Sequence, residues 1–367
     1  MRAQRMVPAI TLDPRLPSYL KQKTNNTVDH HQQQENFVIE EIEGLIRVYK
    51  DGRVERPQIV PCVTAGAADP ELGVTSMDIV IDRFTNVSSR FYVPIRRDMN
   101  NPMKKLPLLV YFHGGGFCVG SAAWSCYHEF LAKLAAKAGC IIMSVNYRLA
   151  PEHPLPAAYE DGLRSLVWLK QEASCERGGE EESNQWWSTQ CDFSRIFLVG
   201  DSAGANIAHN VSRKLLCSET FLLPLIIKGV ILVQPFFGGE DRTSSEKNHD
   251  MVQPRRRSVL NLAASDTYWR LALPAGSNRD HPWCNPLANG SCFGSDSVAM
   301  MVCISELDIL KDREFEFCGA MVRAGKKVET VVYRGVGHAF QVLDKSMLAQ
   351  TRCQEMITHI KAFVENN

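Results

Sequence analysis

The sequence predicts an α/β fold, a mostly parallel central sheet flanked by helices, and three observations carry this prediction. From residue 106 onward, short apolar runs alternate with longer stretches of helical spacing, as in a parallel sheet whose strands are joined by helices. A serine between two glycines lies where one apolar run meets a helical stretch. An acidic cluster and a histidine follow two later apolar runs. Because parallel strands end at a common edge of the sheet, these groups are expected to meet there.

The part of the chain before residue 106 has a different pattern. Residues 1–36 are polar, contain several prolines and include the tract His30-His31-Gln32-Gln33-Gln34, so we expect a flexible segment that forms part of a lid. Residues 37–56 predict a hairpin that turns at Asp51-Gly52. A second pair of strands is expected at 77–81 and 89–93. Residues 37–367 are expected to form one domain.

The segment from residue 106 onward supplies most of the expected sheet and its helices. Strands are expected where apolar residues run together, and helices where apolar residues recur every three or four positions. The expected strands are 106–112, 140–146, 196–199, 229–234, 297–304 and 327–333. The expected helices are 127–138, 157–171, 205–216, 259–271 and 312–324.

Two long insertions interrupt this alternation. Residues 174–190 contain an acidic run and Trp186-Trp187, and we expect a surface excursion there. Residues 238–286 contain a helical stretch and several aromatic residues, and we expect an inserted cap. The basic run Arg255-Arg256-Arg257 within the cap is expected to be a solvated surface.

The segment Gly200-Asp201-Ser202-Ala203-Gly204 follows an apolar run directly and precedes a helical stretch. A G-x-S-x-G turn at a strand-to-helix junction holds the serine in a strained conformation, and a Cβ on either flanking residue would clash with adjacent elements. Ser202 is therefore the predicted nucleophile, with its Oγ exposed above the sheet.

A glycine loop, His113-Gly114-Gly115-Gly116, follows the apolar run at 106–112. Loops of this H-G-G-G type supply backbone N–H groups to the oxyanion that forms when a serine attacks a carbonyl. The N–H groups of this loop and of Ala203 are predicted to converge on that oxyanion.

An acid and a histidine are needed to activate Ser202. His338 follows the strand expected at 327–333, and Glu306, Asp308 and Asp312 follow the strand before it. Asp312 is expected to begin a helix, where a carboxylate is favourable. We favour Asp308, because the apolar neighbours Leu307 and Ile309 can anchor its loop, and Glu306 is the alternative.

Composition excludes several other classes of protein. The 367 residues include 41 basic and 41 acidic side chains, a balance that argues against nucleic acid or an anionic membrane as partner. The twelve cysteines include no C-x-x-C pair and several lie in apolar runs, so we expect reduced core thiols, no metal centre and no cofactor. The amino-terminal residues include no apolar run of signal-peptide length, no run elsewhere is long enough to span a membrane, and a cytoplasmic location is expected.

These motifs resemble a known family. Together with the segment Y-R-L-A-P-E-H-P-L-P-A at 147–157, the H-G-G-G and G-D-S-A-G motifs resemble the hormone-sensitive-lipase-like branch of the α/β hydrolases, and above all the plant class I carboxylesterases. The resemblance covers about residues 37–365. It implies an oxyanion hole made by Gly115, Gly116 and Ala203, and a roof formed by the amino-terminal residues and the 238–286 insertion. The chain departs from the family pattern at Ala205 and Ala339, where glycine is usual.

The predicted function is that of a serine carboxylesterase acting on small-molecule esters, with the oligomeric state left open. Four aromatic residues near the catalytic turns are candidates for substrate contact: Phe117, Trp124, Tyr127 and Phe340. One alternative is a hormone receptor like the gibberellin receptors, which resemble this family but lack the histidine that is present here. The other alternative is a dehydratase or cyclase that uses the same pocket.

Overall fold

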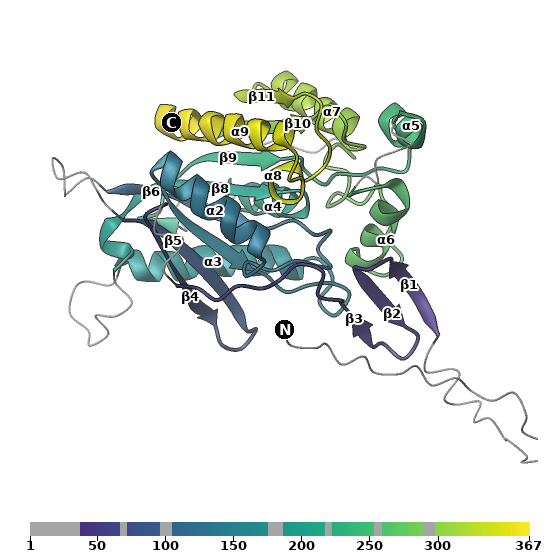
Figure 1. The fold of residues 1–367 in the computed structure, drawn as a ribbon, viewed down its shortest axis with the longest axis horizontal. Helices are drawn as coiled ribbons and strands as arrows, with labels where there is room; N and C mark the ends of the chain where they lie inside the picture. The colour runs from purple at the N-terminus through teal and green to yellow at the C-terminus, as the bar shows by residue number, and fades with distance from the viewer. Residues whose placement is uncertain are drawn as a thin grey trace, which may run out of the picture.

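An eight-stranded sheet forms the centre of the computed structural model, which describes residues 37–66, 72–95, 105–174, 186–216, 222–252, 259–288 and 298–367 (Figure 1). In spatial order the strands are β11 Val328–Tyr333, β10 Ala299–Ser305, β9 Ile227–Val233, β8 Cys191–Asp201, β6 Leu106–Phe112, β7 Ile141–Asn146, β5 Val87–Pro94 and β4 Val74–Asp82. All neighbours from β11 to β7 are parallel, and β5 pairs antiparallel with β7 and β4. The predicted, mostly parallel sheet is confirmed.

Helices cover both faces of the sheet. One face carries α2 (Ser125–Ala138), α8 (Phe340–Leu343) and α9 (Met347–Asn366), and the other carries α3 (Ala157–Ser174), α4 (Ala203–Leu216) and α7 (Lys311–Arg323). Alternate residues of β6 divide between the two cores: Leu108 and Val110 pack on one side, Leu109 and Tyr111 on the other. This two-residue period explains why the strand is apolar throughout, since both of its faces are buried.

The strand order reverses at β6, and this reversal positions the site. The next strand in the chain, β7, lies on one side of β6, whereas β8 lies on the other. Loops that leave neighbouring strands at such a reversal leave a crevice between them. The glycine loop leaves β6 and the Ser202 turn leaves β8, so the two predicted motifs flank this crevice.

The hairpin predicted at 37–56 is wrong, because the segment contains two turns. Strands β1 (Val38–Ile42), β2 (Ile46–Tyr49) and β3 (Val54–Glu55) form a separate three-stranded sheet. Gly44 and Gly52 have φ values of +73° and +86°, which glycine adopts readily. The sequence prediction recognised only the turn at Asp51-Gly52.

The insertion at 238–286 contains two helices, α5 (Ser244–Val252) and α6 (Leu262–Ala272). The predicted helix start at residue 259 is three residues early, because Asn261 caps α6 with its side chain, which accepts a hydrogen bond of 2.8 Å from the Ala264 N–H. α6 lies beside β1, and Arg270 on α6 donates hydrogen bonds of 2.6 and 2.9 Å to Glu40.

The surface excursion predicted at 174–190 is wrong at its carboxyl-terminal end. Trp187, just before the short 3-10 helix η2 (Ser188–Gln190), is fully buried. Its ring centroid lies 4.5 Å from that of Phe91 and 5.9 Å from that of Trp168, so this tryptophan anchors the segment to the core. Residues 175–185 lie outside the described residues.

Most other predicted elements agree with the structure to within a few residues, and α9 was not predicted. The expected flexible segment 1–36, its histidine tract and the basic run Arg255-Arg256-Arg257 all lie outside the described residues.

Candidate active site

Ser202 lies at a sharp turn between β8 and α4, and its φ of +54° is unusual for a residue with a side chain. The two flanking glycines are required by close backbone contacts. A Cβ on Gly200 would lie 2.3 Å from the carbonyl of Gly204, and a Cβ on Gly204 would lie 1.9 Å from the carbonyl oxygen of Phe112. The two glycines of the G-x-S-x-G pattern are therefore needed because α4 packs closely on β6 and β8.

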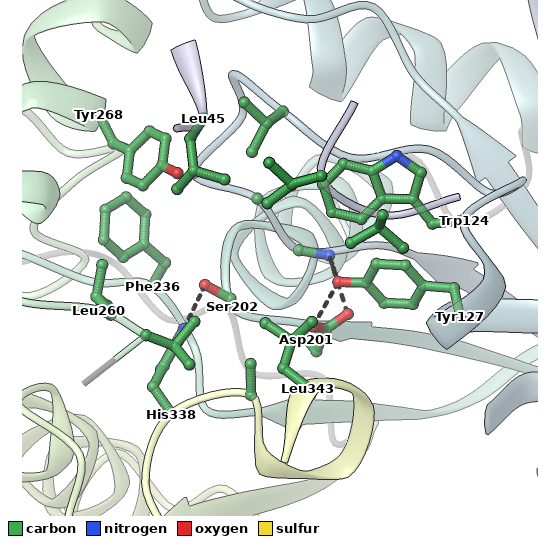
Figure 2. Close-up of a pocket in the computed structure, with 18 of the residues that line it drawn as sticks. Leu45, Trp124, Tyr127, Asp201, Ser202, Phe236, Leu260, Tyr268, His338 and Leu343 are labelled. Carbon is green, nitrogen blue, oxygen red and sulfur yellow. Dashed lines mark hydrogen bonds between the residues drawn. The ribbon is translucent and has the colours of Figure 1, made fainter. Parts of the chain in front are cut away.

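His338 and Asp308 meet Ser202 at the carboxyl edge of the sheet. The His338 Nε2 lies 2.8 Å from the Ser202 Oγ, and its Nδ1 lies 2.6 Å from an Asp308 oxygen. All three side chains are buried, and Figure 2 shows Ser202 and His338 directed at each other. With Nδ1–H donating to Asp308, Nε2 is free to accept the hydroxyl proton of Ser202.

The alternative acid, Glu306, is exposed and points elsewhere, since its carboxylate accepts a 2.8 Å hydrogen bond from the Gly335 N–H. The second Asp308 oxygen accepts a 3.0 Å bond from the Leu310 N–H, which holds the carboxylate in place. Asp312 lies in the first turn of α7, where it accepts from the Ser245 N–H. Of the three acids, the structure thus brings only Asp308 to His338.

The glycine loop and Ser202 line one cavity. Gly115 and Gly116 adopt φ values of +119° and +59°. Among the hydrogen bonds between described residues, none has the N–H of Gly115, Gly116 or Ala203 as its donor. The neighbouring Gly114 N–H, in contrast, donates to Tyr127 and Asp201.

Asp201 is a residue of the candidate site that the sequence analysis missed. Its buried carboxylate accepts hydrogen bonds from the Tyr111 hydroxyl at 2.7 Å, the Tyr127 hydroxyl at 2.9 Å and the Gly114 N–H at 3.0 Å. Burial raises the pKa of Asp201, although these three donors oppose the rise. The sequence does offer one sign of this role: Asp201 is an acidic residue in a turn that directly follows a buried strand.

A cavity of about 390 Å³ opens above Ser202, and we call it the Ser202 cavity. Its walls are mostly apolar and come from the β1–β2 turn, the glycine loop, α2, the 238–286 insertion and the His338 turn. The lining residues are Glu43, Gly44, Leu45, Ile59, Val60, Gly114, Gly115, Gly116, Val119, Trp124, Tyr127, Asp201, Ser202, Phe236, Val259, Leu260, Tyr268, His338, Ala339 and Leu343.

Two of the four predicted substrate contacts, Trp124 and Tyr127, line this cavity, and the other two do not. Phe117 has a φ of +63°, which turns its ring into the core, where its centroid lies 5.5 Å from that of Trp269. Phe340 packs on Tyr333, at 5.6 Å between centroids. Both lie next to the catalytic turns in sequence and both are buried, but neither lines the Ser202 cavity.

A second buried carboxyl, that of Glu314 on α7, lies within electrostatic range of Asp308. The Glu314 side chain is fully buried, and neither of its oxygens has a hydrogen-bond partner among the described residues. Burial, followed by the charge of Asp308, raises the pKa of Glu314 well above its usual range. Burial without a hydrogen-bond partner thus favours the neutral, protonated form of Glu314, which avoids a second buried charge beside Asp308.

Comparison with known proteins agrees with this geometry. A family model described as alpha/beta hydrolase fold matches residues 109–342. The chain is 50% identical over 334 residues to probable carboxylesterase 6 of Arabidopsis thaliana, covering 90% of this chain and 92% of that one. It is 37% identical to 2-hydroxyisoflavanone dehydratase of Glycyrrhiza echinata, covering 82% of this chain and 89% of that one. The solved structure of an esterase from Pyrobaculum calidifontis matches with a TM-score of 0.63 and 25% identity, covering 79% of this chain and 84% of that one.

The chain therefore belongs to the α/β-hydrolase family, in the branch of the plant carboxylesterases that is similar to hormone-sensitive lipase. None of the helices in the described part of the chain is long and apolar enough to cross a membrane.

The raised pKa of Glu314 predicts a pH-dependent effect of the substitution Glu314→Gln. In the unfolded chain this carboxyl ionises at about pH 4.3, whereas burial shifts its ionisation to higher pH in the folded protein. The wild type thus loses stability relative to the variant as pH rises above the unfolded pKa. We expect the melting temperature of Glu314→Gln minus that of the wild type to increase between about pH 4 and pH 8.

Glu316→Gln is the matched control, because Glu316 is exposed on the same helix. A difference for Glu314→Gln that stays constant across this pH range, or that decreases, would show that Glu314 is ionised in the folded protein.

Proposed function

We propose that the protein is a serine carboxylesterase that forms an acyl-enzyme on Ser202. The observation that carries this proposal is the chain of hydrogen bonds from Ser202 through His338 to Asp308, at 2.8 and 2.6 Å, beside backbone N–H groups that have no described acceptor. These are the parts that acyl transfer needs: a nucleophile, a base, an orienting acid and donors for an oxyanion.

In the proposed mechanism the Ser202 Oγ attacks the ester carbonyl while His338 Nε2 takes its proton. Asp308 holds the imidazole and stabilises the imidazolium, and the N–H groups of Gly115, Gly116 and Ala203 donate to the oxyanion. His338 then gives the proton to the leaving alcohol, and the acyl group stays on Ser202. A water molecule, deprotonated by His338, hydrolyses the acyl-enzyme in the second half of the reaction.

We propose short acyl esters or small acylated metabolites without negative charge as the substrates. The Ser202 cavity is mostly apolar, and its size fits a small molecule. Glu43 lies at the wall and disfavours an anionic group there. We propose that β1–β3 and the 238–286 insertion roof the site, because Leu45, Leu260 and Tyr268 of these segments line the cavity. Location in the cytosol and the role of residues 1–36 in the roof stay predictions.

A second candidate function is elimination of water from a specialised metabolite. It is supported by the 37% identity to 2-hydroxyisoflavanone dehydratase and by His338, a base that can remove a proton without an acyl-enzyme. The proposed receptor alternative has less support, because His338 is present and bonded to Ser202. Mass spectrometry of products from a panel of esters and hydroxylated metabolites distinguishes hydrolysis from elimination.

The substitution Ser202→Ala tests the nucleophile. We expect it to lower the turnover of an aryl ester by roughly 10⁶-fold, because no acyl-enzyme can form. An organophosphate should label Ser202 of the wild type, as read by mass spectrometry of the tryptic peptide. Full hydrolysis by Ser202→Ala would rule out the proposed mechanism, because another nucleophile would then have to attack the ester.

Asp308→Asn and Glu306→Gln form a matched pair that tests the orienting acid. Asparagine at 308 cannot hold the correct tautomer of His338, so turnover should fall by roughly 10⁴-fold, as in the serine-protease triad. Glu306→Gln should cost less than about tenfold, because among the described residues the Glu306 carboxylate accepts a hydrogen bond only from the Gly335 N–H and none from the imidazole of His338. Steady-state kinetics with one ester measures both, and the reverse order would assign the role to Glu306.

Gly116→Val tests the oxyanion hole. A Cβ at residue 116 would lie 2.3 Å from the ring of Tyr268, so the loop must move and its N–H must turn away from the oxyanion. Loss of one aimed donor lowers turnover by about 10²–10³-fold, and we expect at least that loss. Gly276→Val is the control: Gly276 also has a positive φ of +81°, but no atom lies within 4 Å of its Cβ position. Near-native turnover of Gly116→Val would contradict the assignment.

A further inference from the structure

A second cavity, of about 520 Å³, lies between α2, α8 and α9, three helices that pack side by side on one face of the sheet (Figure 1). It does not include Ser202 or His338. Lys133, Lys137 and Lys345 line it and are exposed, and we call it the lysine-rimmed cavity. Its volume is in the range of cavities that bind small molecules.

A buried amide in this cavity has no hydrogen-bond partner. Gln341 on α8 lines the cavity and is only 7% exposed. Neither its Nε2 nor its Oε1 has a partner among the described residues. A buried amide in this state destabilises the fold, and a polar molecule in the cavity would remove that cost. Both amide atoms are covered in this structure, so the Gln341 side chain must turn toward the cavity to donate to such a molecule and accept from it.

Three lysines and two acidic residues, Glu129 and Asp344, line the cavity, so positive charges outnumber negative ones there. Lys345 pairs with Glu129 at 3.0 Å, and Lys137 donates to Gln354, but Lys133 has no ion pair within the described part of the chain. The positive charges of the three lysines act on the Cys353 thiol, where they oppose the rise in pKa that burial causes. The three ammonium groups therefore all contribute positive potential at the Cys353 side of the cavity.

The remaining walls are apolar, and they include Phe130, Phe340 and Ile357. On α2, Cys126, Phe130, Lys133 and Lys137 recur at helical spacing, so one face of this helix combines apolar contacts with positive charge. We propose that the lysine-rimmed cavity is a binding site for a small organic carboxylate with an apolar body and a second polar group that bonds Gln341.

The lysine-rimmed cavity shares two walls with the Ser202 cavity. On α2, Tyr127 lines the Ser202 cavity and Phe130 lines the other; on α8, Leu343 lines the first and Gln341 the second. α8 begins two residues after His338. A carboxylate that bridges α2 and α8 therefore stabilises one position of α8 and is linked to the His338 turn. This linkage rests on the proposed esterase function, whereas the binding site does not.

Calorimetric titration of the full chain tests the site. The probe is 4-hydroxyphenylacetate, and its control is 4-hydroxyphenylacetamide, which has the same shape without the charge. We expect the carboxylate to bind at least about tenfold more tightly than the amide, and Lys133→Glu or Gln341→Leu to weaken it by about fivefold or more. Lys361→Glu, on the same helix as Ile357 but outside the cavity, is expected to leave binding unchanged.

Gln341→Leu should also raise the melting temperature of the unliganded protein, because it removes the unpartnered amide. Three results would overturn the site: no saturable binding up to about 10 mM, equal binding of carboxylate and amide, or equal binding by the wild type, Lys133→Glu and Gln341→Leu. The last result would place the probe elsewhere, for example in the Ser202 cavity.

The linkage is tested by ester turnover. A saturating concentration of the carboxylate should change kcat/KM for a neutral short ester by about threefold or more in the wild type and not in Gln341→Leu. An equal change in both proteins would indicate competition at Ser202 and would overturn the linkage. The two proposals fail separately: a missing calorimetric site leaves the esterase mechanism standing, and full hydrolysis by Ser202→Ala leaves the carboxylate site standing.

Discussion

The buried carboxylate of Asp201 fixes the relative positions of the main catalytic parts. It accepts one hydrogen bond each from β6, from α2 and from the glycine loop, and it precedes Ser202 directly. A buried charge is stable only when such donors satisfy it, so the fold must bring all three to the same place. The position of the glycine loop relative to Ser202 thus depends on one side chain that has no part in the proposed chemistry.

The grouping of Ser202, Asp308 and His338 could be predicted from the sequence because it follows from local patterns and from one rule of topology. The glycines around Ser202 indicate close backbone contacts at that turn. Parallel strands bring their carboxyl ends to one edge of the sheet, where Asp308 and His338 also lie. The choice of Asp308 over Glu306 rested on apolar neighbours, and the structure supports it in part: Ile309 is buried, whereas Leu307 is only half-buried.

The cavity wall could not be predicted in the same way. Tyr268 and Leu45 reach Ser202 from segments that are distant in sequence, and no local pattern marks them. Phe117 and Phe340 were chosen because they are neighbours of the catalytic turns, but the backbone turns Phe117 inward. Trp187 was assigned to the surface because it follows an acidic run, although an aromatic ring of its size gains most from burial.

The close contact between Tyr268 and Gly116 restricts how this protein can change over evolutionary time. The tyrosine ring occupies the space that any side chain at residue 116 would need. The insertion that carries Tyr268 and the loop that carries Gly116 are far apart in sequence, yet neither position is independent of the other. A descendant that replaced Gly116 would first have to lose the aromatic ring at 268, and with it part of the cavity wall. Gly116 can therefore change only together with Tyr268. A change of the cavity wall at this point, and with it of substrate choice, is limited by the need to keep the glycine loop intact.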